Sequence, residues 1–150
     1  MIIYRLANTQ FKDDFKGEGA ALFGGRWNSV GMPMFYASSH ISLAVLELLV
    51  NKRTSAYFNI SFHLIEMQIP NNAILEISSH ALKNKWQHDM EYTQFIGDQF
   101  LQESQKWILQ VPSAVIEEEH NYLVNPNHPN MTKMKINSSR SYKLDTRLIT

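Results

Sequence analysis

The feature that most constrains this chain is the clustering of its glycines, because five of the six lie between Gly17 and Gly31. Glycine weakens helix and strand interiors and populates backbone conformations that other residues avoid. We therefore expect residues 17–31 to be irregular, with the regular elements on either side. Within this segment, GGRWNSVG places Arg26 and Trp27 between glycines. This pattern is typical of a turn, or of a loop whose backbone a ligand can approach closely.

Runs of β-branched and aromatic residues predict short strands, since such residues are enriched in strands and turn residues separate the runs. The expected strands lie within residues 1–7, 32–39, 58–69, 72–78, 106–116, 117–130 and 141–150. The third run starts at Phe58, and its apolar positions change phase, which predicts a bulge or break near Leu64. Pro112 interrupts the fifth run and predicts an edge or kinked strand, with Ser113 just past the irregularity.

Two principal helices are expected. Residues 38–52 can start at a cap formed by Ser38 or Ser39, and their apolar side chains on almost every side predict a buried helix. Residues 93–104 form an amphipathic pattern that Gly97 weakens. Together these elements predict an α+β fold, a single domain over residues 1–150 with mixed short-stranded sheets and a few helices.

Composition narrows the class of function. The 150 residues are 44% hydrophobic, enough to bury one good core. Lysine plus arginine and aspartate plus glutamate both number 14, so no net field favours nucleic acid or an anionic membrane as partner. The absence of cysteine excludes disulfides, thiol catalysis and thiolate metal sites. Without a signal peptide or a long apolar run, we expect a cytoplasmic protein.

Glu47 is the carboxylate of the apolar helix expected at residues 38–52. In one interpretation Glu47 and Asn51, four residues apart, mark the solvent-facing stripe of that helix. In the other, the carboxylate lies in a partly dry cleft, where it stabilises a developing positive charge far better than it could in water.

Three further side chains have both a structural and a functional interpretation. Arg26 is either a surface or ion-paired arginine, or a fork of donors that fits phosphate or carboxylate oxygens. Tyr36 is either a core aromatic or a ring on which a planar heterocycle stacks. Ser113, taken alone, is a turn residue.

Other groups are set aside. An acidic and histidine-containing cluster follows no known metal-ligand spacing, so no metal site is expected there (Glu117, Glu118, Glu119, His120 and His128). His63 falls on the polar face of its strand. The C-terminal basic residues lack interleaved aromatics, so they make a weak case for nucleic acid (Lys133, Lys135, Arg140, Lys143 and Arg147). A ribonuclease built on His120 and His128 is the weakest alternative.

The order of several short segments is similar to that of the RES domain family. These segments are YRLA, then GGRWNSVGMPMFYASS followed directly by LAVLELL, then VPSAV, NYLVNP and LDTRL. The resemblance runs from Tyr4 to about Leu148. It places the family's arginine, tyrosine, glutamate and serine on Arg26, Tyr36, Glu47 and Ser113.

The resemblance implies a toxin of a bacterial toxin–antitoxin pair with an ADP-ribosyltransferase-like fold. It further implies that NAD+ is a substrate rather than a bound cofactor, and that the bond between nicotinamide and ribose is cleaved. Water, inorganic phosphate or a protein would accept the ADP-ribosyl group. The implied partner is an Xre-like antitoxin, assembled with the toxin into a hetero-oligomer.

In this scheme Glu47 stabilises the cationic ribose, Arg26 holds the diphosphate and Tyr36 stacks on nicotinamide. Ser113 orients Glu47 or a ribose hydroxyl, and Arg5 on the first strand is a further phosphate contact. A catalytically silent module that binds a nucleotide or a partner's tail remains the alternative.

Overall fold

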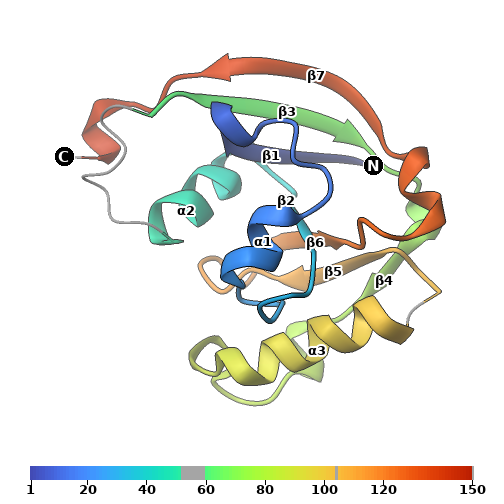
Figure 1. The fold of residues 1–150 in the computed structure, drawn as a ribbon. Helices are drawn as coiled ribbons and strands as arrows, with labels where there is room; N and C mark the ends of the chain where they lie inside the picture. Colours follow the sequence, from blue (N-terminus) through green and yellow to red (C-terminus); the bar gives the residue numbers. More distant parts are fainter. Residues whose placement is uncertain (52–59, 104, 150) are drawn as a thin grey trace.

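A seven-stranded mixed sheet forms the centre of the protein, in the strand order β4-β5-β6-β2-β1-β3-β7 (Figure 1). The computed structural model describes residues 1–51, 60–103 and 105–149. The strands are β1 (Ile2–Asn8), β2 (Phe35–Ser38), β3 (Phe62–Gln68), β4 (Ile74–Glu76), β5 (Ile108–Pro112), β6 (His120–Val124) and β7 (Lys135–Tyr142). β4 and β5 run parallel, and the other neighbours are antiparallel. The expected α+β class is confirmed.

Three α-helices accompany the sheet in the described residues: α1 (Glu18–Phe23), α2 (Ile41–Asn51) and α3 (Met90–Glu103). Figure 1 shows α2 beside β1 and α3 alongside the part of the sheet that contains β4 and β5. In the described parts of the chain, no helix is both long and apolar enough to cross a membrane.

The core divides into three apolar clusters. The largest surrounds Phe35 and Ile65, where β1, β2 and β3 contribute buried side chains. A second, around Trp27 and Trp86, packs beneath α3. The third lies under α2 and includes Val45. The two helices are therefore attached to different parts of one continuous sheet.

The glycine-rich segment is only partly irregular. Helix α1 forms inside it, because Asp14 accepts hydrogen bonds from the backbone N–H groups of Glu18 and Gly19 at the start of the helix. The expected irregularity is found at its ends, where Gly17 and Gly24 have φ values of 67° and 72°. The expectation of a wholly irregular segment was wrong.

Two strand predictions need correction. β5 lies between β4 and β6, so it is not an edge strand, and Pro112 is its last residue, where the missing N–H is tolerated. The last strand is Lys135–Tyr142 rather than residues 141–150, and Thr146–Leu148 forms a 3-10 turn. β7 was missed because its side chains are almost all exposed, which removes the apolar alternation used to find strands.

The phase change in the third run has another cause than the expected bulge near Leu64. β3 pairs regularly with β1 through this point, and the register shift with β7 lies between Glu66 and Met67. Leu64 and Ile65 are both buried, which shows that both faces of the strand are covered there. Phe58, where the predicted strand begins, lies outside the described residues.

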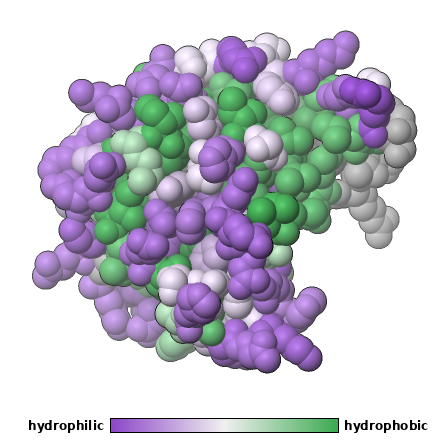
Figure 2. All heavy atoms as spheres, turned by 180° about the vertical axis from the view of Figure 1, so that it is seen from behind, coloured by the Kyte–Doolittle hydropathy of each residue, from purple (hydrophilic) through white to green (hydrophobic). Residues whose placement is uncertain are grey.

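Helix α2 is less buried than expected. Leu43, Ala44 and Val45 are buried, whereas Leu46 and Val50 are exposed. Figure 2 shows the back of the molecule, where polar side chains cover much of the surface and apolar ones gather toward the side that carries α2.

The start of α2 also differs from the expected serine cap. The helical hydrogen bonds begin at His40, whose carbonyl accepts from Ala44 N. Ser38 donates its hydroxyl to Asn121, and the hydroxyl of Ser39 contacts His40 Nδ1.

Candidate active site

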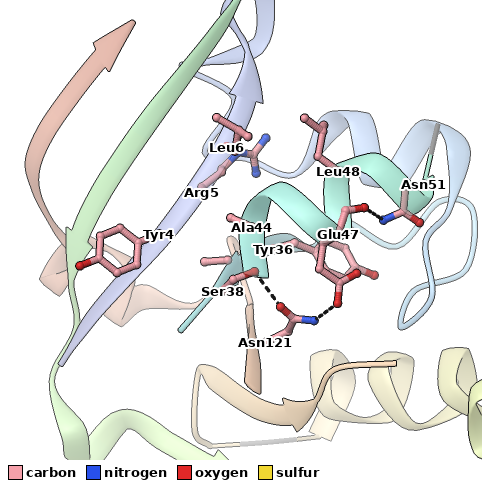
Figure 3. A pocket seen from close by; sticks show the side chains of 11 residues that line it. Tyr4, Arg5, Leu6, Tyr36, Ser38, Ala44, Glu47, Leu48, Asn51 and Asn121 are labelled. Carbon is pink, nitrogen blue, oxygen red and sulfur yellow. Dashed lines mark hydrogen bonds between the residues drawn. The ribbon is translucent and has the colours of Figure 1, made fainter. Parts of the chain in front are cut away.

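A pocket of about 200 Å³ lies at the border between β1 and β2. These two strands are aligned at Tyr4 and Ser38, whereas β1 pairs with β3 along its whole length. The pocket is lined by Tyr4, Arg5, Leu6, Tyr36, Ala37, Ser38, Ala44, Glu47, Leu48, Asn51 and Asn121. Figure 3 shows these residues, with Glu47 of α2 and Asn121 of β6 turned toward each other.

The carboxylate of Glu47 is held by two donors. Its Oε1 accepts a hydrogen bond of 2.7 Å from Ser113 Oγ and one of 2.6 Å from Asn121 Nδ2. The side chain is half-buried, so it does not mark the solvent-facing stripe of α2. Asn51 donates its amide to the carbonyl of Glu47. Both residues line the pocket, and the structure therefore brings this carboxylate into a cleft.

Ser113 is fully buried at the end of β5. Its Oγ accepts hydrogen bonds from the backbone N–H groups of Val115 and Ile116, at 3.0 and 3.1 Å. These contacts leave the hydroxyl hydrogen for Glu47. The turn after Pro112 thus aims the serine at the carboxylate.

Tyr36 joins the pocket to the GGRWNSVG loop. Its hydroxyl donates to Asn28 Oδ1 at 2.6 Å and accepts from Trp27 N at 3.1 Å. Burial raises the pKa of Tyr36; the Trp27 N–H lowers it, Asp98 raises it and Arg26 lowers it. The Tyr36 hydroxyl therefore keeps its proton, and its two hydrogen bonds hold the ring in position.

The loop itself is tightly built. Asn28 is fully buried and donates to the carbonyls of Ala20 and Met32. A Cβ on Gly25 would lie 2.7 Å from both Asn28 Oδ1 and the Tyr36 hydroxyl. The glycine is therefore required by close packing against these two side chains.

Arg26 is not among the described residues that line this pocket. Its Nη1 donates to the carbonyl of Gln87 at 2.9 Å. Its own carbonyl accepts a 2.6 Å hydrogen bond from Thr93 on α3. The charge of Arg26 lowers the pKa of Tyr36, and the next residue, Trp27, donates its N–H to the Tyr36 hydroxyl.

Arg5 lines the pocket from β1. Its guanidinium carbon lies 4.5 Å from the centre of the Phe35 ring. Burial lowers the pKa of Arg5, and the charge of Asp14 raises it. Within the described parts of the chain, its guanidinium donates no hydrogen bond and instead stacks on the Phe35 ring.

Sequence reasoning missed Asn121 and Ser38 as pocket residues. They face each other across the β2–β6 border, and Ser38 donates its hydroxyl to Asn121 Oδ1 at 2.7 Å. Both are polar residues next to the apolar stretches of their strands, which is the one signal in the sequence that could have drawn attention to them.

The groups set aside earlier have local partners. His63 contacts the Thr9 hydroxyl, Gln87 donates to Glu117, and His40 lies 3.3 Å from Glu119. Among the described residues, no three histidine or acidic side chains are grouped so that they could hold a metal ion.

The comparisons with known proteins decide the family. The sequence matches the RES domain over residues 2–145. The chain belongs to the RES domain family. This RES protein is 33% identical to Toxin Res of Photorhabdus laumondii, an alignment that covers 99% of the chain and 97% of that toxin. It is also 33% identical to the Prs ADP-ribosylating toxin of a Sphingobium strain, over 95% of the chain and 91% of the relative.

A solved structure shares the fold. The crystal structure of the M. tuberculosis MbcT–MbcA toxin–antitoxin complex contains a chain that matches with a TM-score of 0.75 and 19% identity. The match covers 94% of this RES protein and 83% of that chain. The family identified from the sequence is confirmed. Because relatives named as toxins align with this chain over almost their full length, we describe the chain as a RES toxin.

Proposed function

We propose that this RES toxin cleaves the nicotinamide–ribose bond of NAD+. Departure of nicotinamide leaves positive charge on the ribose, as in the oxocarbenium-like transition state of glycoside hydrolysis. A fixed carboxylate in a partly buried pocket stabilises such a charge. The observation that carries the proposal is Glu47, which lines the pocket with Oε1 held by Ser113 and Asn121.

The other candidate residues have complementary tasks. Tyr36 would stack on nicotinamide, and its hydrogen bonds to Asn28 and Trp27 keep the ring from turning. Arg26 would hold the diphosphate, after exchanging its bond to the Gln87 carbonyl for phosphate oxygens. Arg5 would be a second phosphate contact, since its donors are not taken by described residues. Ser113 would orient Glu47.

The acceptor of the ADP-ribosyl group is water or inorganic phosphate in this proposal. Transfer to a protein is the second candidate, and the relative named as an ADP-ribosylating toxin favours it. The bond broken is the same in all three cases. A protein that binds a nucleotide or a partner's tail without chemistry is the contrasting class.

We further propose that the toxin acts in the cytoplasm and is neutralised by an Xre-like antitoxin within a hetero-oligomer. The fold shared with a chain of the MbcT–MbcA toxin–antitoxin complex supports a protein partner.

The experiment that tests the reaction follows free nicotinamide by chromatography after incubation with NAD+, with and without phosphate. Wild-type protein should release nicotinamide, together with ADP-ribose in water or an ADP-ribosyl phosphate when phosphate is present. Glu47→Gln keeps the shape and removes the charge, so the rate should fall by about 10²–10³-fold. A radiolabelled NAD+ arm with cell extract detects protein modification.

Glu66→Gln is the matched control. Glu66 is a half-buried glutamate on β3 whose carboxylate also accepts a hydrogen bond from an asparagine, and it lies outside the pocket. Its substitution should leave the rate unchanged. Full nicotinamide release by Glu47→Gln, or none by wild type, would contradict the proposal.

A further inference from the structure

A chain of three polar side chains crosses from β2 to α2 beside the pocket. Ser38 Oγ donates to Asn121 Oδ1 at 2.7 Å, and Asn121 Nδ2 donates to Glu47 Oε1 at 2.6 Å (Figure 3). Ser38 and Asn121 are paired residues on neighbouring strands, so their side chains lie on the same face of the sheet. The register of β2 and β6 thus fixes the asparagine beside the helix.

The two ends of the Asn121 amide are not interchangeable here. Ionised Glu47 can only accept hydrogen bonds, so the amide must present its NH₂ group to it. The amide oxygen then faces the Ser38 hydroxyl, which can donate to it. Ser38 is 5% exposed, so water competes little for this contact.

The two oxygens of Glu47 have different surroundings. Oε1 accepts from both Ser113 and Asn121. Oε2 accepts no hydrogen bond from the residues that the structure describes. One oxygen is therefore used to hold the carboxylate in place, and the other remains available to a ligand in the pocket.

We propose that Asn121 is a positioning residue of the NAD+-cleaving site, which holds Glu47 so that Oε2 is turned toward the ribose. This inference rests on the proposed function. Asn121 touches no reacting atom in this scheme and acts through Glu47. Ser38 acts one step further away, because it holds Asn121.

Asn121→Asp tests this role with almost no change of shape. The variant places two carboxyl groups at hydrogen-bond distance, and such pairs share one proton until the pH rises far enough to remove it. While the proton is shared, the pair keeps the single negative charge of the wild-type site and one hydrogen bond between the two groups. Once it is lost, the two carboxylates repel each other and Glu47 loses its orientation.

The measurement is nicotinamide release as a function of pH, from about pH 5 to about pH 9, because the shared proton leaves within such a range. Asn121→Asp should approach the wild-type rate to within about tenfold at the acidic end and fall by about 10²-fold or more at the alkaline end. Wild-type protein should lack this descending limb. The other titratable groups lining the pocket, Tyr4, Arg5 and Tyr36, are present in both proteins.

Asn137→Asp is the matched control, since Asn137 also donates its amide to a glutamate oxygen, Glu66 Oε1 at 3.2 Å, on the exposed edge of the sheet. Its pH profile should match wild type. If Asn121→Asp does not fold by circular dichroism, Ser38→Ala is decisive, with an expected loss of about tenfold in kcat at unchanged KM, because a freed amide weakens orientation rather than binding.

If the Asn121→Asp rate is unchanged from wild type, or is lower by the same factor at every pH, the positioning role is overturned. An unchanged kcat for Ser38→Ala would overturn it as well. An inactive wild type would instead overturn the proposed function. The shared proton is then still measurable without NAD+, because the unfolding free energy of Asn121→Asp should fall with rising pH more steeply than that of Asn137→Asp.

Discussion

The two borders of β1 differ in a way that explains where the site lies. On one side β1 pairs with β3 from Ile2 opposite Gln68 to Asn8 opposite Phe62, and apolar side chains fill this border. On the other side the alignment with β2 is confined to Tyr4 and Ser38. Polar residues from α2 and β6 approach this second border and line the pocket there. Continuous pairing of β1 with β3 thus stabilises one border of β1. The short pairing of β1 with β2 leaves room for the candidate site at the other border.

The largest effect on stability is expected at the fully paired border between β1 and β3. Ile65→Ala removes a fully buried side chain of the central cluster, so the free energy of unfolding should fall by about 2–5 kcal/mol. Urea unfolding measures this change. Nicotinamide release per folded molecule should stay at the wild-type level, and a selective loss of activity would show that the two borders are coupled.

A smaller effect on stability is expected for Tyr36→Phe, at the border between β1 and β2. Loss of the hydroxyl leaves buried Asn28 Oδ1 and the Trp27 N–H without this partner, which should lower the free energy of unfolding by about 1–3 kcal/mol. Urea unfolding at neutral pH checks this value.

The same pair of proteins predicts a pH dependence. Burial raises the pKa of Tyr36 above its ordinary value near 10, so the folded state holds this proton more tightly than the unfolded state. The resulting stability is complete below about pH 10 and is lost as the pH rises toward the pKa of the folded state. Unfolding curves taken up to about pH 11 should therefore converge for wild type and Tyr36→Phe. Tyr122 is common to both, and parallel curves would be the contrary result.

The smallest effect on stability is expected for Asn137→Ala, on the edge strand β7 that pairs with β3. Its bond to Glu66 is solvent-exposed, and such surface substitutions usually change stability by less than about 0.5 kcal/mol. Thermal unfolding gives the value. A cost as large as that of Tyr36→Phe would remove the contrast between an exposed and a buried hydrogen bond.

The elements that sequence patterns predicted well are those whose own residues carry the signal. β1, β2 and α2 are apolar runs bounded by turn residues, and the structure has each of them near its expected place. Helix α1 gave no such signal, because its start depends on Asp14, four residues before Glu18. β7 gave none either, because its side chains face solvent and the strand is held by backbone pairing with β3.

The site divides in the same way. Glu47 and Tyr36 were candidates from their local sequence, and a resemblance in segment order added Ser113. The structure brings Glu47 and Ser113 into contact across 66 positions of sequence. Asn121 could not be assigned, because its contact with Glu47 depends on the register between β2 and β6 and on the rotation of α2. Neither quantity is encoded in a local pattern.

The glycine at position 97 of α3 determines how closely this helix approaches the loop that carries Arg26. A Cβ at this position would lie 1.6 Å from the Trp27 carbonyl oxygen, so the 14-residue helix and the loop carrying Arg26 are in backbone contact. Because of this contact, the loop cannot move away from its position without a displacement of α3. A ligand or partner protein that reaches this loop would therefore meet a backbone already fixed against α3.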